Sequence, residues 1–329
     1  MKNKFIPRAL VLLACAFALA GCGQKNKPAD DGRLSVVTTI FPPYDFARAI
    51  AGGKAEITML LPPGAETHSF EPRPQDIIKI QKSGVFIYTG GESDTWVENI
   101  LKSMDTSKMK IIAMTECVET VEEEIVEGMQ DDGEEGEHAR NNENGEDGDD
   151  KDKPEYDEHV WTSPRNAKAI VRKIADALIE ADSANADAYR QNAEAYIAEL
   201  DVLDAKIQSV VDSAVRKTLV FGDRFPFRYF TDAYGLRCAA AFPGCAAETE
   251  ASPQTIRTLI QMINEERIPV VFHIELSNRK MAQAICEVTG AQVRLMHACH
   301  NISKEDFEAG ESYLSLMRRN AEALKEALW

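Results

Sequence analysis

The stretch that decides the fold is SANADAYRQNAEAYIAELDVLDAKIQSVVDS, residues 183–213. Ser183 can cap a helix that runs from Ala184 to about Ser213. The apolar side chains of this segment recur at spacings of three, four and seven, at Tyr189, Tyr196, Leu200, Leu203, Ile207 and Val210. A helix of about 30 residues extends for about 45 Å. The segment therefore predicts a rigid helix that joins two lobes.

Short apolar strands alternate with helices on both sides of this segment. Before it we expect strands at 34–40, 56–61, 85–88 and 109–113, and helices at 44–50, 75–82, 95–104 and 166–180. After it we expect strands at 218–221, 238–242, 269–274 and 292–296, and helices at 227–234, 252–266, 278–289 and 310–328. Such alternation predicts parallel sheets that are covered by helices.

The expected fold is therefore α/β, with two lobes that each contain a mainly parallel sheet flanked by helices. We place the N-terminal lobe at 34–163, the linking helices at 164–214 and the C-terminal lobe at 215–329. A segment at about 119–156 is rich in acidic residues and poor in apolar ones, so we expect a disordered loop inserted in the first lobe.

The N-terminus resembles a targeting signal. Basic residues precede an apolar run from Ala9 to Ala20, which is 12 residues long and too short to span a bilayer that needs about 20. The run ends in Leu-Ala-Gly-Cys at 19–22, similar to a bacterial lipobox; an ordinary secretory signal is the alternative. We expect removal of residues 1–21, lipid on Cys22, a tether at 22–33, and an extracytoplasmic protein anchored to the bacterial membrane.

The net charge of −17 is concentrated in one segment. Residues 119–158 contain 19 acidic and 3 basic side chains, whereas the rest of the chain contains 35 acidic and 34 basic ones. The folded body therefore has no basic surface of the kind that binds nucleic acid. The acidic segment is either a solubilising insertion or a weak collector of cations, which would act by electrostatic focusing.

The histidines suggest a metal site at a cleft. His68 lies in a proline-rich loop after a strand, and His159 lies just before a helix. His297 and His300 lie at the carboxyl end of a predicted strand, where ligands collect in α/β sheets. Any one of them alone would be read as structural, but together they indicate metal binding. His273, inside an apolar strand, and His138, in the acidic segment, are read as a core residue and a solvated residue.

Three motifs carry a family resemblance: Thr-Thr-Ile-Phe-Pro-Pro at 38–43, Pro-Gly-x-x-x-His-Ser-Phe-Glu-Pro at 63–72, and His-Val-Trp-x-Ser-Pro-x-Asn at 159–166. With Tyr-Gly-Leu at 234–236, Glu-Val-Thr-Gly-Ala at 287–291 and the tail at 313–328, the chain resembles the zinc/manganese-binding solute-binding lipoproteins of ABC importers. The resemblance covers nearly the whole mature chain. It implies two α/β lobes joined by one long helix, a metal between them, a membrane permease as partner, and a monomer.

The resemblance implies metal ligands residue by residue. His68 and His159 match the two first-lobe ligands of the family. The third ligand would fall at Phe221-Gly222-Asp223-Arg224, where Gly222 replaces it and Asp223 is the nearest carboxylate. The fourth falls at His297, with His300 three residues further on. We expect His297 to be the main second-lobe ligand, with His300 or Asp223 completing the shell.

Ligand chemistry favours zinc as the captured ion, because imidazole-rich tetrahedral sites suit Zn²⁺ and carboxylate-rich sites suit Mn²⁺. The expected function is capture of Zn²⁺ and its delivery to an ABC permease, without catalysis. The alternatives are a zinc-dependent hydrolase with an open coordination position, and a Mn²⁺ receptor or adhesin of the same fold. No His-Glu-x-x-His motif supports the hydrolase.

The cysteines leave alternatives open. Five remain in the mature chain besides Cys22, without any Cys-x-x-Cys pair. Cys245 and Cys299 each follow a predicted second-lobe strand, and a disulfide between them would fix the loop that bears His297 and His300. Cys286 as one partner, ligation of the metal by Cys299, and free thiols are the other interpretations.

Overall fold

The computed structural model describes residues 32–66, 70–129, 156–244 and 251–329. His68, His138, Cys22 and Cys245 lie outside these ranges, as does the predicted signal segment. The description below concerns the compact unit Leu34–Trp329. No helix within the described ranges has the length and apolar character needed to cross a membrane.

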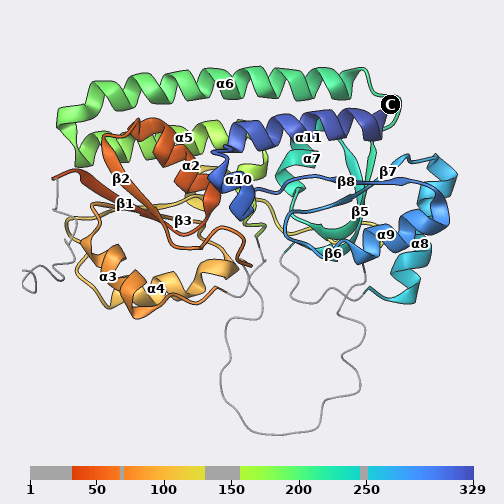
Figure 1. The fold of residues 1–329 in the computed structure, drawn as a ribbon, viewed down its shortest axis with the longest axis horizontal. Coiled ribbons are helices and arrows are strands. Elements are labelled where there is room, and N and C mark those ends of the chain that lie inside the picture. The colour runs from red at the N-terminus through yellow and green to blue at the C-terminus, as the bar shows by residue number, and fades with distance from the viewer. Residues whose placement is uncertain (1–31, 67–69, 130–155, 245–250) are drawn as a thin grey trace, which may run out of the picture. The chain divides into compact units, whose positions relative to one another are not determined.

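Two four-stranded parallel sheets organise this unit (Figure 1). The first contains β1 (Leu34–Thr38), β2 (Ala55–Met59), β3 (Val85–Tyr88) and β4 (Lys110–Ala113), in the order β2-β1-β3-β4. The second contains β5 (Thr218–Phe225), β6 (Arg237–Pro243), β7 (Val270–His273) and β8 (Gln292–Leu295), in the order β6-β5-β7-β8. The two halves thus repeat one topology, and the predicted fold class is confirmed.

Helices flank both sheets (Figure 1). In the first half they are α2 (Phe41–Ala51), α3 (Pro74–Lys82), α4 (Thr95–Lys102) and α5 (Pro164–Ala181). In the second half they are α7 (Arg228–Tyr234), α8 (Pro253–Glu266), α9 (Lys280–Thr289), α10 (Lys304–Glu308) and α11 (Tyr313–Leu328). Short 3-10 turns lie at η1 (Glu92–Asp94), η2 (Thr115–Cys117), η4 (Val160–Thr162) and η5 (Ser183–Asn185).

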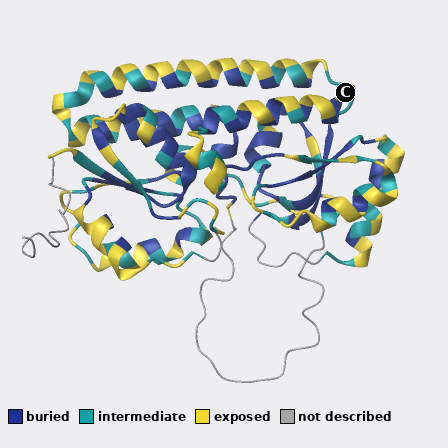
Figure 2. Ribbon diagram, viewed as in Figure 1, coloured by how far each residue is buried: buried dark blue, intermediate teal, exposed yellow. Residues whose placement is uncertain are grey.

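The predicted long helix is α6 (Ala186–Asp212), which has 27 residues. Figure 1 shows it running above both halves, with α5 beneath one end and α11 beneath the other. Its buried face consists of Tyr189, Ala193, Tyr196, Leu200, Leu203, Ile207 and Val211. Figure 2 shows that burial is concentrated in the strands and in the helix faces turned toward them.

Some observed boundaries of helices and strands differ from those predicted, mainly near glycine and proline residues. Helix α2 begins at Phe41 rather than Tyr44, because Pro42 and Pro43 occupy its first turn, where a missing N–H costs nothing. The predicted helix at 310–328 begins only at Tyr313, since Gly310 has a φ of 77° and separates it from α10. Strand β5 continues to Phe225 through an irregularity between Phe221 and Arg224.

The first part of the predicted acidic loop has a defined place. Residues 119–129 follow the first half and reach the second, where the N–H of Ala240 donates to the carbonyl of Glu127 at 3.1 Å. The N–H of Val121 donates to the hydroxyl of Tyr229 at 3.2 Å, and Val126 is buried in the core. Apolar side chains thus hold this stretch, against the expectation of disorder from 119. Residues 130–155 lie outside the described ranges.

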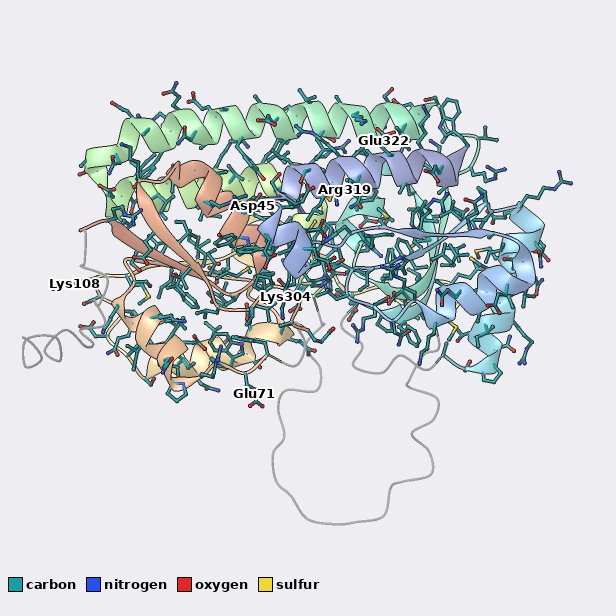
Figure 3. All side chains as sticks on the ribbon, in the orientation of Figure 1. Asp45, Glu71, Lys108, Lys304, Arg319 and Glu322 are labelled. Carbon is teal, nitrogen blue, oxygen red and sulfur yellow. The ribbon has the colours of Figure 1, made fainter. Side chains whose placement is uncertain are left out.

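A buried carboxylate joins the helices of the two halves. Asp45 on α2, labelled in Figure 3, has 1% of its surface exposed. Its Oδ2 accepts hydrogen bonds from the hydroxyl of Tyr196 on α6, at 3.2 Å, and from the N–H of Tyr313 at the start of α11, at 2.9 Å. Its Oδ1 lies 2.6 Å from the guanidinium of Arg48. One side chain therefore ties α2, α6 and α11 together.

We expect Asp45→Ala to lower the free energy of unfolding by about 3 kcal/mol, because it leaves two buried donors without an acceptor. Urea unfolding monitored by circular dichroism measures this value. Asp201→Ala, which removes a 59% exposed partner of Lys168, is the control and should cost less than about 1 kcal/mol. Equal losses in the two variants would contradict the role given to Asp45.

Candidate metal centre

His159 is fixed by its own local turn at the boundary between the halves. It immediately precedes η4 and is fully buried. Its Nδ1 lies 3.0 Å from Oδ1 of Asp157, which also accepts the N–H of His159 at 2.8 Å. The carbonyl of Asp157 accepts from the hydroxyl of Tyr229 at 2.7 Å. The carboxylate favours a proton on Nδ1, so that Nε2 carries the lone pair that a metal can use.

Glu275 organises the loop that follows β8. Its carboxylate accepts the N–H of Ala298 at 2.7 Å and the N–H of His300 at 2.9 Å. Between them Cys299 adopts a left-handed backbone with φ of 63°, which turns the chain around the carboxylate. Although burial opposes ionisation, the imidazoles of His297 and His300 and the N–H of Ala298 lower the pKa of Glu275 to about 2. The residue is therefore a fixed negative charge.

His300 resembles His159 in its electrostatic setting. Its Nδ1 lies 3.7 Å from Oε1 of Glu275, which favours a proton on that nitrogen. Burial lowers the pKa of His300. The neighbouring His159 also lowers it, whereas Glu275 raises it. The imidazole is therefore neutral at physiological pH, and a metal can bind it without displacing a proton.

The structure brings His159 and His300 together across the boundary. Their ring centroids are 4.6 Å apart at an interplanar angle of 80°. Trp161 contacts both rings, with centroid separations of 5.6 Å to His159 and 5.2 Å to His300. Its indole N–H donates to the carbonyl of Ala298 at 2.8 Å, and its own carbonyl accepts from the hydroxyl of Tyr313. Trp161 thus locks the two histidine-bearing loops against each other.

The space around this pair is narrow. One cavity, of about 10 Å³, is lined by residues that include Asp94, Glu158 and His300. A second, of about 20 Å³, is lined by residues that include Glu66, Arg224, Glu275 and His300. Each has room for about one water molecule. Larger hollows adjoin both of them: one of about 190 Å³ shares Glu66 and Arg224 with the second cavity, and one of about 960 Å³ shares Asp94 with the first.

His297 lies on the other side of Glu275, inside the second half. Its Nδ1 is 3.5 Å from Oε2 of Glu275 and accepts the N–H of Cys299 at 3.0 Å. Its main-chain N–H and carbonyl both bond to the side-chain amide of Asn320 on α11, at 2.7 and 2.8 Å. The expectation that His297 is the main ligand stays a prediction, whereas His300 is the imidazole that lies beside His159.

Three further residues discussed from the sequence, Asp223, Gly222 and His273, make structural contacts within the second half. Asp223 is 6% exposed, and its oxygens accept the N–H groups of Arg224 and Ile274 at 2.9 and 3.2 Å, so it fixes the ends of β5 and β7. Gly222 packs against α9, where an added Cβ would lie 2.6 Å from the Cα of Ala282. His273 is buried and its Nδ1 lies 2.8 Å from the carbonyl of Ile274, as expected of a core histidine.

Cys299 carries a fully buried sulfur, and burial raises the pKa of its thiol well above the usual range. Its predicted disulfide partner, Cys245, lies outside the described residues, and the pairing stays a prediction. The same holds for His68 as a ligand. Within the described ranges, no group of three or more His, Cys, Asp or Glu side chains is arranged to hold a metal ion.

Sequence reasoning missed Glu275, Asp157 and Trp161. Glu275 follows β7 by two residues, and the rule that ligands collect beyond the carboxyl ends of parallel strands could have singled it out. Asp157 precedes His159 by two residues, a spacing at which a carboxylate can reach the imidazole Nδ1. The contact between Trp161 and Ala298 joins residues 137 positions apart, and no local pattern signals it.

Two α/β halves of one topology, bridged by a single long helix and enclosing a small polar site between them, define the class of two-lobed solute-binding proteins. The family model described as zinc-uptake complex component A, periplasmic, matches residues 36–327. The chain belongs to this family, which comprises zinc-binding substrate-binding proteins of ABC transporters.

Individual relatives agree with this assignment. The high-affinity zinc uptake system protein ZnuA of Bacillus subtilis is 30% identical over 322 residues, which is 97% of this chain and 96% of that protein. The zinc-binding lipoprotein AdcA of Streptococcus pneumoniae is 31% identical over 320 residues, and this chain spans 60% of its length. The Zn(II)-bound ZnuA-like domain of that AdcA superposes with a TM-score of 0.71 at 27% identity, covering 90% of this chain and 99% of the domain.

A pH-dependent contribution to stability follows from Asp94, next to the site. Its carboxylate is 5% exposed and accepts the N–H of Thr89 at 2.6 Å. Burial, together with the charge of Glu158, raises its pKa to about 6. Because an unfolded chain has a value of about 4, the folded protein binds more protons between these values, and this residue's contribution to stability falls as the pH rises through that window.

We therefore expect Asp94→Asn to gain stability relative to the unsubstituted protein as the pH rises from 4 to 7, by about 3 kcal/mol in total. Urea unfolding at unit pH steps measures the difference. Asp187→Asn, at a fully exposed position, is the control and should show no such trend. A difference between Asp94→Asn and the unsubstituted protein that does not vary with pH would contradict the shifted carboxyl group.

Proposed function

We propose that this protein is an extracytoplasmic receptor that captures Zn²⁺ between its two halves and delivers it to an ABC permease. The observation that carries the proposal is the pair of His159 and His300, whose rings meet across the boundary with a carboxylate facing each Nδ1. In metal-binding histidines the ring nitrogen that does not bind the metal typically donates to a carboxylate, a main-chain carbonyl or water, which fixes the tautomer. Membership of the zinc-uptake family supports the same conclusion.

The proposed ligands are His159 and His300, together with His68 from the preceding loop. His297 and Asp223 remain the other proposed second-lobe ligands. Imidazole nitrogens bound at a tetrahedral site favour Zn²⁺ over Mn²⁺. Lipid on Cys22 would hold the receptor at the outer face of the membrane, where it meets the permease as a monomer.

Family membership and the absence of a His-Glu-x-x-His motif from the sequence argue against the zinc-hydrolase alternative. A hydrolase must admit an organic substrate to an open coordination position on its zinc. The relatives that the chain matches are named as zinc-uptake and zinc-binding proteins, and none of these names describes a hydrolase. Transport without turnover therefore fits the family and the sequence better.

We expect His159→Ala and His300→Ala each to weaken zinc binding at least tenfold, equivalent to about 1.4 kcal/mol, because each removes a nitrogen ligand. Asp157→Asn should weaken binding by about 10–100-fold through misorientation of His159. Competition with a chelating dye measures the affinities, and repeating it with Mn²⁺ tests the choice of metal.

His138→Ala, in the acidic segment, is the matched histidine control and should bind zinc normally. His297→Ala decides whether that imidazole is also a ligand. The proposal fails if His159→Ala and His300→Ala both keep the affinity of the unsubstituted protein, or if the protein hydrolyses ester, peptide or phosphate substrates when loaded with zinc.

A further inference from the structure

The residue that follows His300 makes two side-chain hydrogen bonds across the boundary between the halves. Asn301 is fully buried. Its amide nitrogen donates to the carbonyls of Pro62 and Ala65, both at 2.8 Å, and its amide oxygen accepts the N–H of Ile302 at 2.8 Å. One side chain thus donates two hydrogen bonds to main-chain carbonyls of the other half.

Main-chain hydrogen bonds on either side of Asn301 reach the same half. The N–H of Gly64 donates to the carbonyl of Ile302 at 2.8 Å, and the N–H of Phe41 donates to the carbonyl of His300 at 3.3 Å. Residues 300, 301 and 302 are therefore each bonded to the first half. We call the loop at 62–66 and these three residues the clamp.

We infer that Asn301 is a positioning residue for zinc, which holds the imidazole of His300 against His159 and thereby sets how slowly bound zinc is released. The inference rests on the proposed function and extends it to a residue that supplies no ligand. The amide nitrogen of Asn301 is only a donor, and both its protons are used by Pro62 and Ala65. Its effect on the metal must act through His300.

The physical argument concerns what separation of the halves would cost. If the halves moved apart at this point, both buried hydrogen bonds of the Asn301 amide would break and water would have to replace them, which costs free energy. An exposed contact on the same loop provides a contrast. Glu66 pairs with Arg224 at 3.2 Å, but its side chain is 46% exposed, so water and salt weaken the pair. The buried amide of Asn301 is therefore the stronger link of this loop to the second half.

The test compares Asn301→Ala with Asn192→Ala. Asn192 on α6 also donates its amide to a main-chain carbonyl, that of Ile50 at 3.0 Å, but it lies away from the candidate site. Zinc release is measured by stopped flow against an excess of chelator. Amide hydrogen exchange at Gly64 is measured on the metal-free protein, and urea unfolding reports global stability. Asn301→Ser, which keeps a single donor, serves as the second variant if Asn301→Ala folds poorly.

We expect Asn301→Ala to accelerate zinc release at least tenfold and to raise exchange at Gly64 at least tenfold, with Asn301→Ser intermediate. Asn192→Ala should lower stability without changing either quantity. Zinc release and Gly64 exchange that match the unsubstituted protein, or that change equally in Asn192→Ala, would overturn the inference alone. Absence of zinc binding by the unsubstituted protein would overturn the proposed function and the inference together.

Discussion

The packing of α6 against both halves is the constraint on which the rest of the molecule depends. Its buried face contacts α2 and α5 in the first half and α11 in the second. Each fully buried Leu or Ile on this face contributes about 2 kcal/mol. A continuous helix has no internal joint, so the two sheets are held in one relation, and the loops at their strand ends meet. Asp45 reinforces this relation by bonding to α6 and α11 from α2.

Within that frame, the site combines the fixed charge of Glu275 with the neutral imidazole of His300. Glu275 remains ionised because two main-chain N–H groups and two histidines surround it, whereas burial keeps His300 neutral. An ionised Glu275 beside a neutral His300 suits the binding of a cation. The imidazole nitrogen has a lone pair available for the metal, and the carboxylate compensates part of the positive charge. The clamp around Asn301 and the indole of Trp161 then hold these groups in place from both sides of the loop.

Much of the fold could be predicted from periodicity, because the alternation of short apolar runs with helical spacing leaves few other arrangements. The bounds of α6 are within two residues of those expected. Its buried residues run from Tyr189 to Val211, so the apolar periodicity of the sequence marks the extent of the helix. The candidate site was harder to predict from the sequence than the fold. His159 stood out by its context, but the choice between His297 and His300 depends on a left-handed turn at Cys299, which sequence spacing does not reveal. The order of residues 119–129 was missed because their acidic composition obscured three apolar anchors, Val121, Val126 and Met129.

The glycine that directly follows β6, Gly244, constrains how this chain can diverge. A Cβ on Gly244 would lie 2.8 Å from Cε1 of His159, closer than side-chain atoms approach each other. A mutation there would displace the imidazole although residue 244 touches no metal. The residue at position 244 therefore restricts where the imidazole of His159 can lie. A homologue with a larger residue at this position must hold its first-lobe imidazole in another place. Comparison of natural variants at 244 would separate lineages that share this site from lineages that share only the fold.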